Sequence, residues 1–288
     1  MNKELEPLLT RVDAILDRLE HLLPAPPATV DFARTTAFRW RKRAGRGFLD
    51  PVRHPHAISF ADLCDIDEQK QRLRENTAQY VAGRPANNVL LTGARGTGKS
   101  SLVKAALNEF AKKGLRLIEV DKADLVDLPD IVDLVAERRE RFIVFCDDLS
   151  FEASEPGYKA LKVALDGTIS GSAENVLLYA TSNRRHLMPE FMDENLQARH
   201  VNGEIHPGEA TEEKISLSER FGLWLSFYPF DQDQYLDIAE HWVEALGGKA
   251  DDASRRAALL WALERGSRSG RVAWQFAKDW LGRKIRKA

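Results

Sequence analysis

The glycine-rich segment Gly93-Ala-Arg-Gly-Thr-Gly-Lys-Ser100 constrains the fold of this chain more than any other feature. It fits the pattern G-x-x-x-x-G-K-[ST] and lies between an apolar run at 89–92 and a helical pattern at 99–112. Its glycines let backbone N–H groups wrap around phosphate oxygens, and the start of a helix adds positive potential. The pattern therefore predicts a phosphate-binding loop between a strand and a helix.

Within this loop, Lys99 is expected to reach the β- and γ-phosphates of a nucleotide, and Ser100 is expected to place its hydroxyl on Mg²⁺. The residues expected to contact the nucleotide here are Gly93, Ala94, Arg95, Gly96, Thr97, Gly98, Lys99, Ser100 and Ser101.

Two carboxylates, Asp147 and Asp148, follow the strictly apolar run at 142–146. The first acid after such a strand holds Mg²⁺, and we assign this role to Asp147. Asp148 is expected to polarise the attacking water; the alternatives are that it only supports the magnesium ligands, or that Glu152 is the base. Asn183 ends another apolar run and is expected to hydrogen-bond the attacking water or the γ-phosphate, although Thr-Ser-Asn is also typical of a turn.

Short apolar runs alternate with helical segments from residue 87 to residue 229, which is typical of a parallel sheet with right-handed crossovers. Strands are expected at 89–92, 115–120, 142–146, 176–181 and 223–228, and helices at 99–112, 131–139 and 158–169. After Pro229 the strand pattern stops, and helices are expected at 235–246, 253–265 and 271–285. The sequence thus predicts an α/β domain with a five-stranded parallel sheet and flanking helices, followed by a small helical domain.

The first 27 residues form a separate segment. Apolar residues at heptad spacing predict a helix over 1–23, and the prolines at 24–27 end it and stiffen a linker. This helix either packs on its own domain or forms a small coiled coil with a partner helix.

The segment 34–53 is strongly basic, with seven Lys and Arg residues against the single acid Asp50. Interleaved with them are the aromatic residues Phe38, Trp40 and Phe48. Such a mixture can bind nucleic acid through phosphate contacts and stacking. It can equally dock on an acidic surface of the same protein or of a neighbouring subunit, so both interpretations stay open.

The whole chain is nearly neutral, although its charges are segregated along the sequence. Its 42 Lys and Arg against 44 Asp and Glu give a formal net charge of −2, while acids gather between 119 and 137. Near-neutrality excludes a generally polybasic protein, and 43% hydrophobic residues exclude an acidic disordered tail. With no 18-residue apolar run, no signal-peptide pattern and only the cysteines Cys64 and Cys146, we expect a cytoplasmic protein without membrane contact or a disulfide framework.

The order of these features resembles that of the AAA+ ATPases: phosphate loop, acid-ended strand, Asn-tipped strand, Arg-Phe segment and helical lid. In that family an arginine finger reaches the nucleotide of the next subunit, and the matching position in this sequence is Arg220. The sensor-2 arginine, which touches the γ-phosphate, matches Arg271, with Arg268 as an alternative by spacing. The stretch before the phosphate loop cradles adenine, which implies that Asp65 and Ile66 lie near the base.

Longer strings resemble one bacterial branch of these ATPases, the domain-of-unknown-function family 815. They are Ala86-Asn-Asn-Val89, Gly93-Ala-Arg-Gly-Thr-Gly-Lys-Ser-Ser-Leu102, Phe145-Cys-Asp-Asp-Leu-Ser-Phe-Glu152, Ala180-Thr-Ser-Asn-Arg-Arg-His-Leu187 and Arg265-Gly-Ser-Arg-Ser-Gly-Arg271. The likeness extends from residue 38 to residue 280. Paired aspartates are part of that family's pattern, so the resemblance makes Asp148 compatible with an active enzyme.

The combined prediction is an ATP-binding AAA+ P-loop ATPase that uses Mg²⁺. We expect it to hydrolyse MgATP to drive remodelling or loading of an unidentified protein client, as a homo-oligomer with Arg220 acting in trans. The alternative is a nucleotide-switched adaptor with little turnover, associated with nucleic acid through 34–53. The expected divisions are an N-terminal helix and linker at 1–27, a basic and adenine-side lead-in at 28–86, the ATPase domain at 87–229 and a helical lid at 230–288.

Overall fold

The computed structural model describes residues 11–12, 30–151, 155–166, 173–184, 199–201, 204–206 and 218–285 of the 288-residue chain. The helix predicted at 1–23 lies outside the described residues, except for Arg11 and Val12, which are helical. Glu152, the alternative base, also lies outside them. In the described part of the chain, no helix is both long and apolar enough to cross a membrane.

The main sheet has seven strands in the order β2-β1-β4-β5-β6-β3-β9. They are β1 (Ala37–Arg43), β2 (Arg46–Pro51), β3 (Val89–Gly93), β4 (Leu115–Glu119), β5 (Arg141–Cys146), β6 (Val176–Ser182) and β9 (Leu223–Phe227). Neighbouring strands run parallel, except that β1 and β2 form an antiparallel hairpin. The five expected strands make up the parallel part from β4 to β9. The prediction of a five-stranded sheet is therefore wrong in strand number, because the basic segment adds two strands. A separate antiparallel ribbon pairs β7 (Arg199–Val201) with β8 (Glu204–His206).

The basic segment forms strands because its aromatic residues alternate with its charges. Phe38 and Trp40 are buried, whereas Arg39 and Arg41, one position later in each case, are exposed. This two-residue period is that of a strand with one buried and one solvated face. The composition of 34–53 does not reveal these strands, whereas the alternation of its aromatic and charged residues is typical of them.

The hairpin docks on acidic residues of its own chain. The Trp40 indole N–H donates to Asp127 at 2.8 Å, and Lys42 Nζ lies 2.7 Å from a carboxylate oxygen of the same residue. Asp127 ends the 3₁₀ helix η3 (Lys122–Asp127), which follows β4. Arg39 Nε lies 3.0 Å from Glu119 at the end of β4. One of the two interpretations of the basic segment, docking on an acidic surface of the same protein, thus applies to these residues.

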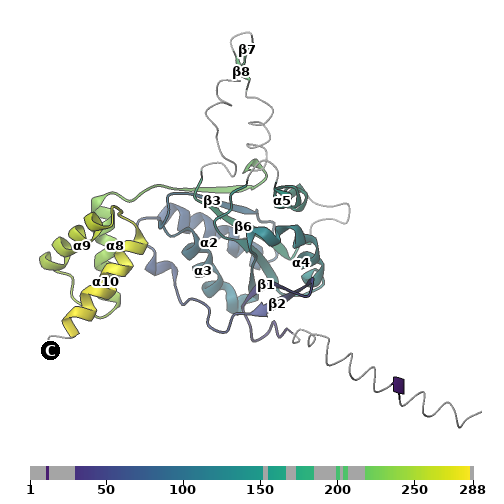
Figure 1. Cartoon of the computed structure of the whole chain (residues 1–288), viewed down its shortest axis with the longest axis horizontal. Helices are drawn as coiled ribbons and strands as arrows, with labels where there is room; N and C mark the ends of the chain where they lie inside the picture. Colours follow the sequence, from purple (N-terminus) through teal and green to yellow (C-terminus); the bar gives the residue numbers. More distant parts are fainter. Residues whose placement is uncertain are drawn as a thin grey trace, which may run out of the picture.

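Helices cover both faces of the sheet (Figure 1). The helices α2 (Asp67–Val81) and α3 (Lys99–Phe110) share one hydrophobic core with one face, and α4 (Leu128–Val135) and α5 (Pro156–Asp166) share a second core with the other. The central strand β5 supplies both cores. Ile143 belongs to the first and Val144 to the second, as expected for a fully buried parallel strand.

The helix α2 was not expected from the sequence, because its buried face is partly polar. Beside Leu73 and Tyr80 it buries Asn76 and Thr77, which interrupt the apolar periodicity that predicts a helix. Both polar side chains hydrogen-bond the buried Tyr179 hydroxyl of β6, Thr77 at 2.9 Å and Asn76 at 3.2 Å. Thr77 also donates to the Leu73 carbonyl and Asn76 exchanges hydrogen bonds with the Asn87 backbone, so these polar groups are satisfied partly by their own surroundings and partly by a strand that lies far along the chain.

Three helices follow β9, close to the ranges expected from the sequence: α8 (Gln232–Ala245), α9 (Asp252–Glu264) and α10 (Gly270–Ile285). We refer to them together as the lid. Tyr235, Ala239 and Phe276 of the lid belong to the same hydrophobic core as α2 and α3, so the core of the lid is continuous with the core on that side of the sheet.

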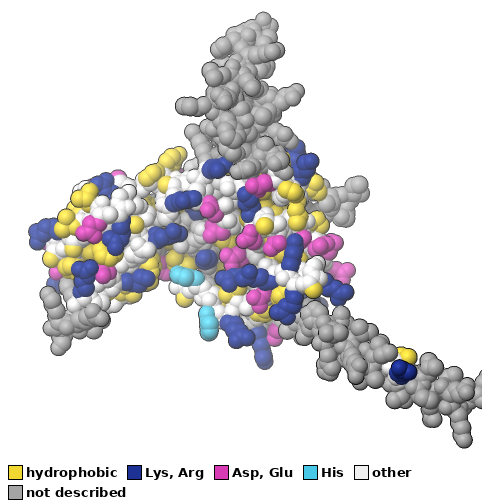
Figure 2. Space-filling model, viewed as in Figure 1, with side chains coloured by type: hydrophobic (Ala, Val, Ile, Leu, Met, Phe, Trp, Pro, Cys, Tyr) yellow, Lys and Arg dark blue, Asp and Glu magenta, His cyan; other side chains and the backbone are white. Residues whose placement is uncertain are grey.

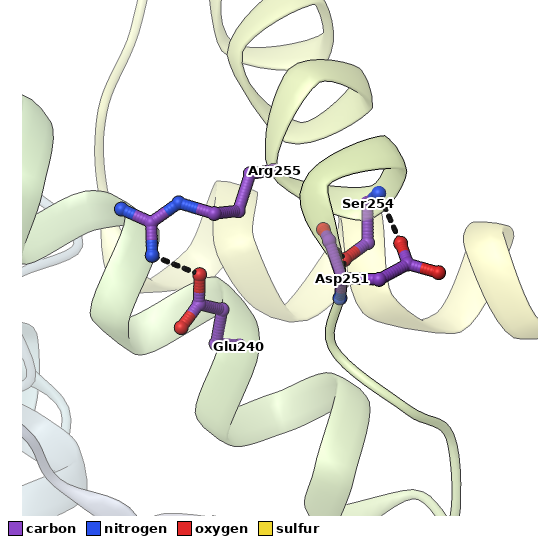
Figure 3. Close-up of polar contacts among 4 residues, drawn as sticks. All are labelled: Glu240, Asp251, Ser254 and Arg255. Carbon is purple, nitrogen blue, oxygen red and sulfur yellow. Dashed lines mark hydrogen bonds and ion pairs between the residues drawn. The ribbon is translucent and has the colours of Figure 1, made fainter.

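The lid helices are joined by polar contacts near the start of α9 (Figure 3). Arg255 on α9 makes an ion pair with Glu240 on α8. The helix α9 begins with a capping box, in which Asp251 Oδ1 accepts from the Ser254 N–H at 2.8 Å and Ser254 Oγ accepts from the Asp251 N–H at 2.9 Å.

Replacing Asp251 with alanine should therefore weaken the lid, because the buried Ser254 loses the acceptor for its backbone N–H. We expect Asp251→Ala to lower the free energy of unfolding by about 1 kcal/mol, measured as a shift of the urea midpoint at an unchanged m-value. The control Asp252→Ala removes the neighbouring exposed carboxylate and should cost less than about 0.5 kcal/mol. Equal losses for both variants would contradict the role of the cap.

Candidate functional site

A cavity of about 610 Å³ lies where the sheet, the glycine-rich loop and the lid meet. The loop follows β3, Asp147 and Asp148 follow β5, and Asn183 follows β6, so the cavity lies at the carboxyl ends of three adjacent parallel strands. The lid helices α8 and α10 provide another wall. Figure 2 shows the surface indented between the lid and the body of the sheet.

The loop begins in close contact with β9. Gly93 has a φ of +130°, and a Cβ at this position would lie 1.9 Å from the carbonyl oxygen of Phe227. The same carbonyl accepts a hydrogen bond from the Ala94 N–H at 3.1 Å. Only glycine allows the loop to leave β3 at this point.

The other side of the loop touches the start of α10. Gly96 has a φ of +74°, and a Cβ there would lie 2.8 Å from the side chain of Ser269. The Gly96 carbonyl accepts from the Gly270 N–H at 2.9 Å. The loop is therefore held between the edge strand of the sheet and the last lid helix.

Lys99 is the buried cation of the site, with 6% of its surface exposed. Its ammonium donates to the carbonyls of Gly93 at 2.8 Å and Ala94 at 2.7 Å, and to the Asn183 side-chain oxygen at 3.0 Å. Burial lowers the pKa of Lys99, while the charges of Asp147 and Asp148 oppose that shift. The three hydrogen-bond partners are uncharged, so the positive charge is available to an anion in the cavity.

Ser100 and Asp147 make direct contact across the cavity floor. The Ser100 hydroxyl donates to Asp147 Oδ1 at 2.5 Å, and the Thr181 hydroxyl of β6 donates to the same oxygen at 2.5 Å. Hydroxyl and carboxylate oxygens are the ligands that Mg²⁺ prefers. The residue pair expected from the sequence to hold magnesium is therefore brought together and fits that ion.

Asp148 is held in a left-handed backbone conformation, with a φ of +54°. Its N–H donates to the Thr181 hydroxyl at 2.9 Å, and its side chain accepts a hydrogen bond from the Asn183 amide. Left-handed conformations of residues other than glycine occur at functional sites, where the surroundings stabilise them. Because Asn183 also accepts from Lys99, one amide links the buried cation to this carboxylate.

Of the three candidate arginines, one lies at the cavity. Arg271, the second residue of α10, lines it, whereas Arg268 does not. Between the two sensor-2 positions, the geometry therefore favours Arg271. Arg220 precedes β9 and is not among the lining residues of its own chain.

Of the two residues expected near adenine, one lies at the cavity. Ile66 lines the cavity, but Asp65 does not. Asp65 has a φ of +60°, and its buried Oδ2 has no hydrogen-bond partner in the described part of the chain. Burial, with the nearby charge of Asp237, raises the pKa of Asp65. Gly93 and Ala94 also lie off the cavity wall, where their carbonyls hold Lys99.

Two aromatic residues of the wall were expected in the core of the lid and not at a ligand site. Trp242 of α8 and Trp274 of α10 line the cavity, with ring centroids 4.5 Å apart and ring planes at 67°. The apolar side chains of Ile58 and Leu63, from the segment that precedes α2, also line it. A signal was present, because Trp274 follows Arg271 by three residues and so lies on the same face of one helix.

The seven-stranded sheet, its phosphate loop and the helical lid define an AAA+ P-loop fold, as the sequence resemblance implied. The model of a protein family described as "Protein of unknown function (DUF815)" matches residues 33–284, and the chain belongs to this family.

Two curated relatives carry the description "ATP-dependent zinc metalloprotease". FTSH 9 of Arabidopsis thaliana chloroplasts is 28% identical over 207 residues, which are 61% of this chain and 24% of that protein. FtsH of Ralstonia pickettii is 30% identical over 165 residues, or 47% of this chain and 22% of that protein. The chain thus spans about a quarter of the length of these relatives. The solved ORC1 protein of Aeropyrum pernix in complex with DNA shares the fold, with a TM-score of 0.50 and 19% identity over 73% of this chain and 57% of that chain.

Cys64 also lines the cavity and gives a chemical test of this geometry. Burial, together with the charge of Asp65, raises the pKa of its thiol. The chain's only other cysteine, Cys146, is fully buried, and burial raises the pKa of its thiol to about 12.

Alkylation of the native protein should therefore be slow at neutral pH and occur at Cys64 alone, because the thiolate is the reacting species. Below its pKa, the thiolate fraction rises about tenfold per pH unit, so the rate should rise steeply from pH 7 to pH 9. Mass spectrometry of the iodoacetamide adduct measures this rate, and Cys64→Ser should abolish labelling. A rate at pH 7 equal to that of free cysteine would contradict the described environment.

Proposed function

We propose that the protein binds MgATP in this cavity and hydrolyses it. The observation that supports this proposal is that three features lie together at the amino end of α3. They are the buried cation Lys99, the contact of the Ser100 hydroxyl with the Asp147 carboxylate, and the contact of the Asn183 amide with the Asp148 carboxylate. Lys99, Asp147 and Asp148 all line one cavity, and Asn183 connects the first to the third. Phosphoryl transfer requires this combination of charge neutralisation and orientation of water.

The phosphates bind at the amino end of α3, where the helix dipole and free N–H groups attract anions. Lys99 supports this step because its ammonium is desolvated and bonded only to neutral oxygens. When β- and γ-phosphates enter the cavity, they replace part of these contacts with hydrogen bonds in which the acceptor oxygen is charged as well as the donor.

Ser100 and Asp147 hold Mg²⁺, which, when bound, offsets the negative charge on the transferring phosphoryl group. Thr181 keeps the Asp147 carboxylate in one orientation through its hydrogen bond to Oδ1. This second contact supports the assignment, because a metal ligand needs a fixed direction as well as the right charge.

Asp148 accepts a hydrogen bond from the attacking water and takes its proton. The water oxygen forms a bond to the γ-phosphorus, while the bond from that phosphorus to the bridging oxygen breaks and ADP leaves with the electron pair. Asn183 holds the Asp148 carboxylate, and its link to Lys99 couples the position of the base to the occupancy of the phosphate site.

The lid supplies further contacts. Arg271 reaches the γ-phosphate from the start of α10, and the Trp242 and Trp274 rings border an apolar slot for the base with Ile66. Aromatic faces suit a planar base because stacking adds to the burial of its area.

Arg220 acts on the nucleotide of a neighbouring copy in a homo-oligomer. An arginine that served its own site would have to reach its own cavity, which Arg220 does not line. Its surroundings support a defined position, since Ser218 and Phe221 on either side are buried. The energy of hydrolysis would then be used on an unidentified protein client by remodelling or loading.

The alternative is an adaptor that binds ATP and changes partners without sustained turnover. The variant Asp148→Asn distinguishes the two functions, because it removes the proton acceptor and leaves Lys99, Ser100 and Asp147 intact. We expect ATP binding within about threefold of the wild type by calorimetry and a loss of turnover of about 100-fold or more in phosphate release.

The control Asp130→Asn makes the same charge change at an exposed position of α4 and should keep full turnover. An Asp148→Asn protein that hydrolyses ATP at the wild-type rate would refute the assigned role. A wild-type protein that binds ATP without any measurable turnover, alone and concentrated, would favour the adaptor.

The role of Arg220 is tested by mixing two inactive proteins. Arg220→Ala keeps an intact cavity and loses the finger, and we expect its turnover to fall about 1,000-fold. Lys99→Ala loses its own cavity chemistry and keeps the finger. An equimolar mixture should recover about a quarter of the wild-type rate if interfaces form at random, because each active interface needs one copy of each kind.

A mixture that stays inactive would contradict action in trans. The control Arg256→Ala removes an exposed lid arginine and should leave the rate unchanged. The wild-type specific activity should also rise with protein concentration as copies associate.

A further inference from the structure

The β1–β2 hairpin carries three exposed arginines that form no ion pair with the described residues of the chain. Arg39 and Lys42 pair with acids of β4 and η3. Arg41, Arg43 and Arg46 are exposed, and no acidic residue in the described part of the chain pairs with them. The structure thus separates the basic residues that pair with acids of the same chain from those that are exposed without such a pair among the described residues. The composition of the segment does not show this difference.

These three arginines share one face of the hairpin. In the antiparallel register Arg43 lies opposite Arg46, and Arg41 lies opposite Phe48, and residues opposite one another point to the same side. The Arg43 guanidinium lies over the half-buried Phe48 ring, 5.8 Å from its centroid. The same face also holds Arg39 opposite Asp50, and beyond these two residues it presents three guanidinium groups and one aromatic ring. We call it the arginine face.

The arginine face extends past the end of the neighbouring strand β4. Pairing of β1 with β4 ends at Arg39 and Glu119, so Arg41 and Arg43 extend past the end of β4. Ala44 and Gly45 close the hairpin with positive φ values of 50° and 75°. Two such residues form the tight turn that matches strand twist. Figure 2 shows dark blue side chains in the region of this hairpin.

The charge arrangement costs the folded protein free energy unless an anion binds. Like charges directly opposite each other on paired strands are destabilising, and Arg43 and Arg46 are such a pair. Arginine side chains bind phosphate groups through two parallel N–H bonds, and their planes stack on bases and aromatic rings. A strand of phosphates with exposed bases satisfies both features of this face.

We propose that the arginine face binds single-stranded nucleic acid, with Arg41, Arg43 and Arg46 on successive phosphates and an unpaired base on the Phe48–Arg43 stack. Charge complementarity selects a polyanion, and the aromatic ring selects one whose bases are open to stacking. The site is distinct from the ATP cavity. Nucleic-acid binding at this face can therefore be tested independently of ATP hydrolysis.

The test uses the full chain, without ATP, and fluorescein-labelled single-stranded DNA and RNA oligonucleotides with 5′-hydroxyl ends, so that the phosphate loop is not offered a terminal phosphate. Fluorescence anisotropy should detect binding at about 50 mM salt that weakens towards about 200 mM. Three phosphate contacts on a single strand predict a slope of log K against log salt of about −2. No binding to either oligonucleotide at the lower salt would overturn the proposal.

The variant Arg41→Ser/Arg43→Ser/Arg46→Ser should bind at least about tenfold more weakly and lose most of the salt dependence. The matched control Lys249→Ser/Arg256→Ser/Arg283→Ser removes the same charge from exposed positions in the lid region. It should bind as the wild type does. Equal losses in both variants would show non-specific attraction and overturn the site.

Two further measurements separate single-stranded nucleic acid from other polyanions. Phe48→Ala should weaken single-strand binding about tenfold, because it removes the stacking surface. Circular dichroism and the urea midpoint show whether this variant keeps its fold, and Phe48→Tyr, which keeps a ring, should bind normally. Duplex DNA or polyglutamate that binds as tightly through the same arginines would overturn the choice of ligand.

Discussion

The contact between the glycine-rich loop and the start of α10 is the constraint on which the site depends. The Gly270 N–H bonds the Gly96 carbonyl at 2.9 Å, and no side chain fits between Gly96 and Ser269. This approach brings Arg271 and Trp274 to the cavity, because both follow on the same helix. Without it, the loop would remain an open turn at the edge of a sheet, and the cavity would lack its second wall.

Strand β6 supports the chemistry of two neighbouring strands. It lies between β5 and β3, and from there Thr181 hydrogen-bonds both Asp147 and Asp148, while Asn183 hydrogen-bonds Lys99 and Asp148. Polar side chains at the carboxyl end of one strand therefore orient the groups that follow the other two. A network of this kind is rigid because each member has more than one partner.

Local patterns predicted much of this architecture. The five parallel strands and the lid helices follow from apolar runs and helical periodicity, and the phosphate loop follows from its motif. The helix α2 and the β1–β2 hairpin were not predicted. Asn76 and Thr77 interrupt the apolar helical period of α2, and the arginines of β1 obscure its two-residue strand period. In each case the stabilising partner, such as Tyr179 or Asp127, is distant in sequence, so no local window contains the reason for the fold.

The sequence by itself determined the residue types of the site: a lysine and a serine after a glycine-rich loop, two aspartates after one apolar strand and an asparagine after another. The tertiary structure decided which candidates meet. It brought Arg271 and Ile66 to the cavity, left Arg268 and Asp65 off its wall, and added two tryptophans. Within the described residues, it also separated the basic side chains of the hairpin that pair with acids, Arg39 and Lys42, from three exposed arginines that do not. The physical reason is that motifs act over a few residues, whereas strand order and lid docking join side chains across the whole chain.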